Sequence, residues 1–498
     1  MRITLFNLSP LLSSDGSRLI AALLKRANHK VISVYMARLE PLYCNSSELE
    51  SLDDILKQSD LVMIGVYSTY AARAIQITEF VHNRYPGLKV IWGGPHCISA
   101  PELSIRYADG VCFSEGDEAV VELVKRMESG ADYLDAPNMA FNINGSIFQN
   151  KVLAPFSDLD SLPYYDYEFE DQYLLNKDLV PMTKGIFRQH ISLYPYNKPT
   201  LYVLTARGCP HNCSYCNNCR YTALFNNNPI RIQSADRIMD ELGWTLQRLD
   251  FVKFIGFGDD DFFARSIEEL AAFAEKYRRR IGLPFGIAVS ANSFQKKKME
   301  ILLDSGLKII QMGVQSGSEI ILKEVFHRKI KLSKTREAVN QIASYHDMYN
   351  LDLLLDFIID NPYETQDDII KTYNYILDLP PSVMLNIFFL SFFPGTPIYE
   401  RALGEGIIEP FTCESFRRYG RSPVRYQKNY ETFLVILTRY LRSNSKRKNM
   451  PLALMRALGS RPMRVLASIL PASLYAFLGK AMQIKTHVKM KNTAKTLL

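Results

Sequence analysis

Three closely spaced cysteines constrain this chain more than any other feature of its sequence. Cys209, Cys213 and Cys216 follow one another with gaps of three and two residues. Thiolates are the protein ligands of iron–sulfur clusters, and a structural cubane takes four of them. Three cysteines leave one iron without a protein ligand, as a cluster that binds a small molecule requires. The spacing therefore predicts a 4Fe-4S cluster with one open iron, and zinc is the alternative.

The number and the spacing of the cysteines indicate a reducing compartment. Eight cysteines in 498 residues are too few for a disulfide scaffold, and four of them, Cys219 included, lie within residues 209–219. Residues 1–30 lack the order of a signal peptide, because Asp15 and Arg18 interrupt it. We expect a cytoplasmic protein. We interpret Cys219 as an incidental thiol, and an approach to the cluster or the substrate as the alternative.

The first 130 residues alternate apolar strands with amphipathic helices. Residues 3–7, 31–35, 61–66, 89–92 and 111–113 are typical of strands, and residues 18–27 and 71–83 have helical spacing. This pattern predicts a doubly wound parallel sheet, whose ligand lies at the carboxyl ends of the strands. Small and polar residues follow the third, fourth and fifth strands at that edge: Ser68, Thr69, Gly93, Gly94, Pro95, Glu115 and Gly116.

Two further regions follow. Residues 131–200 are predicted to be a packed linker, with a hairpin at residues 141–147 that turns at Asn-Gly. From residue 201 to 400 the alternation resumes, with strands expected at 201–206, 251–257, 285–290, 308–314, 352–359 and 384–391. Ser234 and the pattern Thr365-x-x-Asp368 open two of the helices. Six repeats predict a partial (β/α)6 barrel, with its chemistry at the carboxyl strand ends.

The motifs resemble those of one enzyme family. The run C-x3-C-x-aromatic-C, with Tyr215 in the aromatic position, resembles the signature of the radical S-adenosylmethionine (SAM) superfamily. The preceding Thr-Ala-Arg-Gly at 205–208 fits the version found in families that also carry a cobalamin domain. The succession W-G-G-P-H at 92–96 and S-E-G-D-E at 114–118 resembles that cobalamin-binding domain. The resemblance implies three cofactors, namely a 4Fe-4S cluster, SAM and cobalamin.

The same resemblance implies roles for several residues. Asp259 and Asp260, after the second barrel strand, match the position that holds the SAM amino group, and a solvated helix-capping turn is the alternative. Gln315 and Ser316 match the position of the SAM ribose, although Gln315 stands where related sequences carry glutamate. The D-x-H-x-x-G run that supplies a histidine to cobalt is missing. We therefore expect no histidine ligand from that loop, and we interpret His96 as a plain loop histidine.

The family implies a radical methyl transfer. SAM cleaved at the cluster yields a 5′-deoxyadenosyl radical, and cobalamin delivers a methyl group to an unactivated carbon or a phosphorus of a secondary metabolite or lipid. A flavodoxin or ferredoxin type of protein would supply the electron. The first alternative is a cyclase or ring-rearranging enzyme with the same cofactors and no methyl transfer. A methylthiotransferase, which would use Cys44, Cys97 and Cys112, is a weaker alternative because their flanks do not match. We assign no catalytic residue from sequence.

The C-terminal region, residues 401–498, is basic and is predicted to be helical. From Phe411 onward there are 18 Lys and Arg against Glu414 and Glu431, a balance of +16, whereas the remainder carries −9. Residues 465–479 lack charge but are too short to span a bilayer. We interpret the region either as a contact with the membrane periphery or as a helical cover of the barrel mouth. Nucleic acid is not expected, because aromatic residues do not interleave with the basic clusters.

Overall fold

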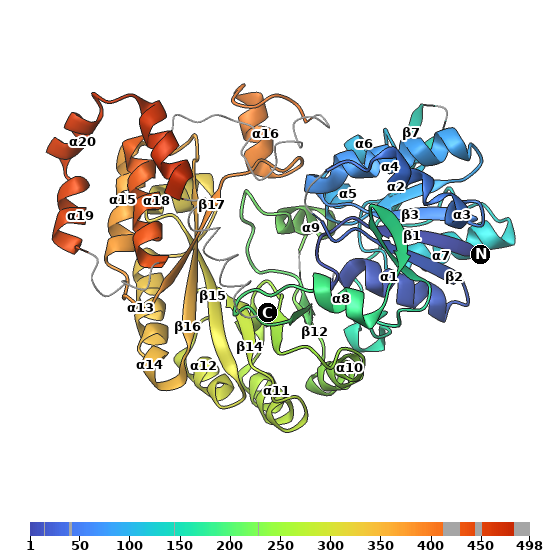
Figure 1. The fold of residues 1–498 in the computed structure, drawn as a ribbon, viewed down its shortest axis with the longest axis horizontal. Helices are drawn as coiled ribbons and strands as arrows, with labels where there is room; N and C mark the ends of the chain where they lie inside the picture. Colours follow the sequence, from blue (N-terminus) through green and yellow to red (C-terminus); the bar gives the residue numbers. More distant parts are fainter. Residues whose placement is uncertain are drawn as a thin grey trace.

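The chain folds around two sheets that lie side by side (Figure 1). The computed structural model describes residues 1–13, 15–38, 42–143, 145–227, 229–411, 429–443 and 451–482. Five parallel strands form the centre of the first sheet, in the order β5-β4-β3-β1-β2. Their bounds are Arg2–Asn7 for β1, Lys30–Tyr35 for β2, Leu61–Gly65 for β3, Val90–Gly93 for β4 and Gly110–Cys112 for β5. These are the five strands that the sequence predicts, to within about two residues at each end.

Helices cover both faces of this sheet. Helices α1 (Asp15–Arg26) and α7 (Ala119–Ser129) bury apolar side chains against one face, and α4 (Ala71–Arg84) packs on the other. A parallel sheet needs both faces covered, and this explains why its strands are almost wholly apolar. The arrangement leaves the carboxyl ends of β1, β3, β4 and β5 as the open edge of the domain.

The segment that we expected to be a linker extends the first sheet at both edges. Strands β6 (Met139–Ile143) and β7 (Ser146–Gln149) form an antiparallel hairpin beside β5. Gly145 adopts φ 86° in its turn, and Asn144 lies outside the described residues. Strand β8 (Gln172–Asn176) pairs in parallel with β2, and β9 (Asp178–Pro181) closes that edge. The first sheet therefore has nine strands.

The second sheet is an open barrel of six parallel strands in chain order. These strands are β10 (Thr200–Val203), β13 (Phe254–Phe257), β14 (Phe285–Val289), β15 (Leu307–Gln315), β16 (Asp352–Ile359) and β17 (Met384–Phe389). The side chain of Ser234 caps helix α10 (Ala235–Arg248), and Thr365 and Asp368 form the predicted capping box of α15 (Gln366–Leu377). The predicted fold class, a doubly wound domain followed by a partial barrel, is confirmed.

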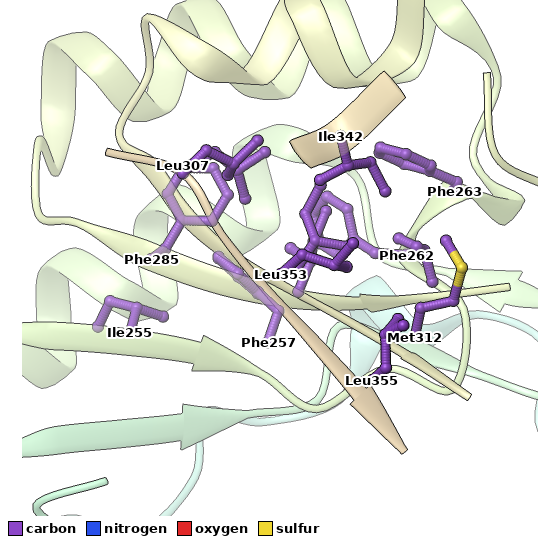
Figure 2. Packing of buried hydrophobic residues seen from close by; sticks show 14 of the residues in the cluster. Ile255, Phe257, Phe262, Phe263, Phe285, Leu307, Met312, Ile342, Leu353 and Leu355 are labelled. Carbon is purple, nitrogen blue, oxygen red and sulfur yellow. The ribbon is translucent and has the colours of Figure 1, made fainter. Parts of the chain in front are cut away.

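Side chains that alternate along the barrel strands separate a core from a lumen. Figure 2 shows Ile255, Phe285 and Leu353 in the apolar layer between the strands and the outer helices. Gly256 and Gly286, each next to one of these residues in the chain, line the lumen instead. Successive strand residues point to opposite faces, and glycine adds no side chain, so the lumen stays open.

The described C-terminal helices pack on the outside of the barrel. Helix α18 (Tyr430–Ser443) contacts α15 and the edge strand β17, and Arg442 donates hydrogen bonds to the carbonyls of Ile376 and Leu379. Helices α19 (Leu452–Leu458) and α20 (Arg461–Ala467) continue at the end of the molecule away from the first domain (Figure 1). These helices therefore do not cover the side of the barrel that faces the first domain.

Candidate active site

The cysteine loop leaves the first barrel strand and crosses the lumen. It runs from the short strand β11 (Ala206–Arg207) to helix α9 (Asn218–Phe225). Ser214 anchors it: its backbone N–H donates to the carbonyl of Phe326 at 3.1 Å, and its carbonyl accepts from Ile398 N–H at 3.1 Å. Cys209, Cys213 and Cys216 all line the lumen cavity, whose volume is about 390 Å³. The structure thus brings the three predicted ligands to one wall.

The surroundings of these thiols disfavour their charged form. Burial raises the pKa of Cys209 to about 12 and that of Cys216 to about 11, although backbone N–H groups of His211 and Asn218 oppose the rise. A coordinated metal overcomes such a cost, because a thiol bound to a metal loses its proton. Across the ranges that the structure describes, no three His, Cys, Asp or Glu side chains converge as they would around a single metal ion.

Arg328 connects the cysteine loop to the fourth barrel strand. Its guanidinium donates to the Tyr215 hydroxyl at 3.0 Å, to the Cys213 sulfur at 3.9 Å and to the Gly313 carbonyl at 2.9 Å. The Tyr215 ring meets Phe326 edge-on, with ring centroids 5.1 Å apart. Tyr215 therefore holds the loop as well as lining the cavity. No sequence motif pointed to Arg328, which lies 115 residues from Cys213.

The two predicted aspartates after β13 have different surroundings. Asp259 is buried and accepts hydrogen bonds from Thr205 N–H at 2.6 Å, Ala206 N–H at 2.9 Å and the Thr205 hydroxyl at 2.7 Å. It also pairs with buried Arg265 at 2.9 Å. These contacts fix the strand end that leads into the cysteine loop. They occupy both carboxylate oxygens of Asp259.

Asp260 faces the cavities instead. It lines the lumen beside Cys209 and Cys216, and it also lines a second cavity between the two domains. Its side chain is accessible from both, yet the surrounding protein walls raise the pKa of Asp260 to about 6, and a hydrogen bond from Asn218 opposes that rise. The carboxylate is therefore ionised at neutral pH and available to a cationic group.

Gln315 and Ser316 also separate in space. Gln315 ends β15 at a register shift with φ 73°, and it lines the lumen. Among the described residues, no hydrogen-bond partner reaches its buried side-chain carbonyl oxygen. Ser316 is fully buried beside Glu364 and Thr372, at 3.3 Å and 3.2 Å between oxygens, and it does not line the cavity. Of the two predicted ribose contacts, the structure thus places only Gln315 at the lumen.

The second cavity, of about 580 Å³, lies between the first domain and the barrel. The predicted cobalamin contacts Gly93, Gly94, Pro95, Glu115 and Gly116 line it, together with Gly16 and Gly65. At Gly65 a Cβ atom would lie 2.9 Å from the Ser17 hydroxyl, and Gly94 adopts φ 97°. Bare backbone lets a ligand approach the strand ends closely, so this wall fits the edge of a large planar cofactor.

The other predicted contacts lie behind this wall. Ser68 and Thr69 do not line the cavity, and the Ser68 hydroxyl lies 2.9 Å from Nδ1 of His96. His96 is buried outside the cavity, and burial lowers its pKa to about 4, so its ring is neutral. His96 lies in the short helix α5 (Pro95–Ser99), so the interpretation of a plain loop histidine is wrong, and the residue does not line the cavity.

The two cavities meet at four residues, Cys216, Asn218, Gly258 and Asp260, which line both of them. Ion pairs join the domains beside this junction. Arg207 of the barrel donates to Asp117 at 2.7 Å and 2.9 Å, and Arg231 on strand β12 (Arg231–Ile232) pairs with Glu115 at 2.8 Å. A ligand in the interdomain cavity therefore lies next to one in the lumen.

Comparisons with known proteins identify the class. Residues 203–376 match the family model of the radical SAM superfamily, and residues 2–124 match that of the B12 binding domain. The chain is a member of the radical SAM superfamily with an N-terminal B12-binding domain. The family prediction is confirmed, and so at this level are the predicted cluster, SAM and cobalamin.

The named relatives of this chain include methyltransferases and a cyclase. The chain is 24% identical to an uncharacterized methyltransferase, PH0819, of Pyrococcus horikoshii, over 71% of this chain and 72% of that protein. It is 22% identical to the cobalamin-dependent radical SAM methyltransferase TokK of Streptomyces tokunonensis, over 72% of this chain and half of TokK. An anaerobic magnesium-protoporphyrin IX monomethyl ester cyclase of Synechocystis is 22% identical, over 66% of this chain and 61% of the cyclase.

A solved structure has the same fold. The radical SAM methyltransferase TsrM from Kitasatospora setae, with cobalamin and a 4Fe-4S cluster bound, superposes with a TM-score of 0.64 at 14% identity. The match covers 81% of this chain and 78% of TsrM.

Proposed function

We propose that this protein is a cobalamin-dependent radical SAM methyltransferase that methylates an unactivated carbon, or a phosphorus, of a secondary metabolite or lipid. The observation that carries the proposal is the junction of the two cavities at Cys216, Asn218, Gly258 and Asp260. When bound, the cofactors would supply reductive cleavage of SAM in the lumen and a methyl group from the interdomain cavity. A shared wall allows both to act on one substrate atom.

The residues of the chain would divide the work of binding. Cys209, Cys213 and Cys216 would hold the cluster. The Asp260 carboxylate, which faces the lumen from beside these cysteines, would hold the SAM amino group. Gln315, which lines the lumen, would accept a hydrogen bond from the SAM ribose.

Several predicted residues would act indirectly. Asp259 and Arg265 would position the strand end before the cysteine loop, and Arg328 would position Tyr215 and Cys213. Ser316 would keep its place in the hydroxyl cluster behind Gln315. The glycines of the interdomain cavity would admit cobalamin, and Ser68 would hold His96 away from it. We also propose that the chain divides into four regions, with boundaries at residues 130, 200 and 400.

Two partners complete the proposal. A flavodoxin or ferredoxin type of protein would supply the electron, and the basic C-terminal region would contact the membrane periphery. The cyclase or ring-rearranging alternative uses the same cavities. PH0819, which this chain matches over 72% of that protein's length, is named a methyltransferase, and this supports methyl transfer.

The ratio of co-products tests the reaction. Reconstituted protein would be incubated with methyl-labelled SAM, a reductant and a panel of candidate metabolites and lipids. Methyl transfer consumes one SAM as methyl donor and another as radical source. S-adenosylhomocysteine and 5′-deoxyadenosine should therefore accumulate in about equal amounts, with label in the product. Deoxyadenosine without S-adenosylhomocysteine, alongside a converted unlabelled substrate, would refute methyl transfer and support the cyclase alternative.

A further inference from the structure

The C-terminal helices expose an unusual number of large apolar side chains. Val465, Leu466, Ile469 and Phe477 are 62%, 60%, 77% and 70% exposed, and Leu452, Leu454, Leu470 and Leu474 are 38–56% exposed. These residues lie on α19, on α20, on the helix formed by Ala472–Met482 and, for Ile469 and Leu470, in the turn between the last two helices. We name the exposed side chains of residues 465–477 the apolar face. Contiguous exposed apolar groups are typical of an interaction site, whereas apolar residues exposed singly are not.

The opposite side of the same helices is firmly seated. Ala467 and Tyr475 are buried, and the Tyr475 hydroxyl donates to the carbonyl of Ala467 at 2.8 Å. The Tyr475 ring packs against Tyr430 of α18, with centroids 5.2 Å apart. Arg464 pairs with Glu431 at 3.0 Å and with Asp367 at 2.9 Å. The helices are therefore docked on the barrel by one side, and the apolar face is what remains outward.

The sequence that contains this face is basic. After Glu431 the last 67 residues contain 13 Lys and Arg and no Asp or Glu. Arg461 and Lys480, both exposed, flank the apolar segment. Two copies of this face would bring like charges together, which disfavours a second copy as the partner. An anionic phospholipid surface complements the positive charge and accepts the apolar side chains at once.

The geometry fits a helix pair that lies in the interface of a bilayer. Within the described ranges no single helix is long and apolar enough to cross a membrane. Helix α20 and the helix Ala472–Met482 pass that test together but bend by 104° at their junction. Two short helices joined by such a bend can both lie along the bilayer surface, with their apolar side chains in the same shallow layer of the lipid. The pair also lies at the end of the molecule away from the first domain (Figure 1), so docking leaves the interdomain cavity uncovered.

We propose that the apolar face docks the protein on an anionic phospholipid bilayer, with Leu466, Ile469 and Phe477 inserted below the headgroups and the surrounding Lys and Arg at the lipid phosphates. This inference rests on the membrane contact of the proposed function and specifies its residues and its lipid, but it does not depend on methyl transfer, because it needs neither the cluster nor a substrate. Failure of one proposal therefore leaves the other standing.

Vesicle flotation of the full-length protein tests the proposal. Vesicles of phosphatidylcholine with about 30% phosphatidylglycerol should carry the protein at low salt, and pure phosphatidylcholine should carry at least about fivefold less. The triple variant Leu466→Ser, Ile469→Ser and Phe477→Ser should lower the partition coefficient at least about thirtyfold. Exchanging Arg461 and Lys480 for Gln should lower it roughly fivefold for each charge, and only at low salt.

A matched control uses exposed apolar residues elsewhere. Ile320, Met348 and Phe148 are 61%, 75% and 51% exposed, and their triple exchange to Ser should change partition less than about twofold. Absence of flotation on anionic vesicles at low salt would overturn the proposal, as would equal loss in the control. Concentration-dependent dimerisation that the Leu466, Ile469 and Phe477 variant abolishes, without flotation, would show instead that the face binds a second copy.

Discussion

Replacing Asp259 should destabilise the barrel far more than replacing its neighbour Asp260. Asp259 is 1% exposed and pairs with Arg265, which is 2% exposed. Removing one partner of a buried ion pair costs about 3–5 kcal/mol, because the other charge stays buried. The backbone N–H groups of Thr205 and Ala206 would also lose their acceptor, at about 1–3 kcal/mol each when unpaired. These costs overlap, so we expect Asp259→Ala to destabilise by at least about 4 kcal/mol.

That loss is a large part of the about 5–15 kcal/mol that holds a domain folded. Urea unfolding followed by circular dichroism would measure it, alongside the iron content after reconstitution. Asp260→Ala removes a carboxylate that lines the cavities and has a raised pKa. Its free energy of unfolding should stay within about 1 kcal/mol of the parent. SAM cleavage by Asp260→Ala should nevertheless fall at least about tenfold.

A double variant separates charge pairing from packing. Asp259→Leu with Arg265→Met removes both charges, and apolar replacement of a buried pair is often nearly neutral. We expect the double variant to be more stable than Asp259→Leu alone by at least about 2 kcal/mol. An Asp259→Ala protein as stable as the parent, or an Asp260→Ala protein that unfolds first, would refute our distinction between the two aspartates.

Three further predictions concern the cofactors. Alanine at Cys209, Cys213 or Cys216 should abolish both the cluster, about four irons per chain, and SAM cleavage; iron that persists in any of these variants contradicts the ligand assignment. Cys219→Ala should retain both, and a loss of iron would make Cys219 a ligand. Bound cobalamin in its cobalt(II) form should show no nitrogen splitting from a histidine in electron paramagnetic resonance. Splitting that disappears in His96→Ala would show that we misplaced His96.

Local sequence patterns predicted the strands and caps well, because alternation and capping act over a few residues. The pattern D-D-D could not separate Asp259 from Asp260, since the difference arises from Arg265 and Thr205, which only the fold brings to Asp259. The resemblance to related sequences places Ser316 at the SAM ribose together with Gln315. Neighbouring side chains on a strand point in opposite directions, and the backbone turns at Gln315, where φ is 73°. Ser316 therefore points away from the cavity and lies beside Thr372.

Long-range partners explain what remained invisible in the sequence. Arg328 reaches Tyr215, Cys213 and Gly313 from a loop without a recognisable motif. The Arg328 guanidinium thereby holds the cysteine loop against β15. The spacing of the cysteines does not predict this contact. Asn218 differs, because it lies two residues beyond Cys216 and its position in the junction of the cavities could have been inferred.

The loop after β5 shows why a motif for ligand binding can also be a motif for assembly. Glu115 lines the interdomain cavity, as expected of a cobalamin contact, but its carboxylate oxygens accept from Arg231 and from the backbone N–H of Phe156. Asp117, two residues on, accepts both hydrogen bonds of Arg207, which stands just before the cysteine loop. Through these contacts the S-E-G-D-E run joins the barrel to the wall that is predicted to bind cobalamin. Gly116, in the middle of the run, adds no side chain to the cavity wall. The same five residues therefore connect the two domains and leave room for a ligand.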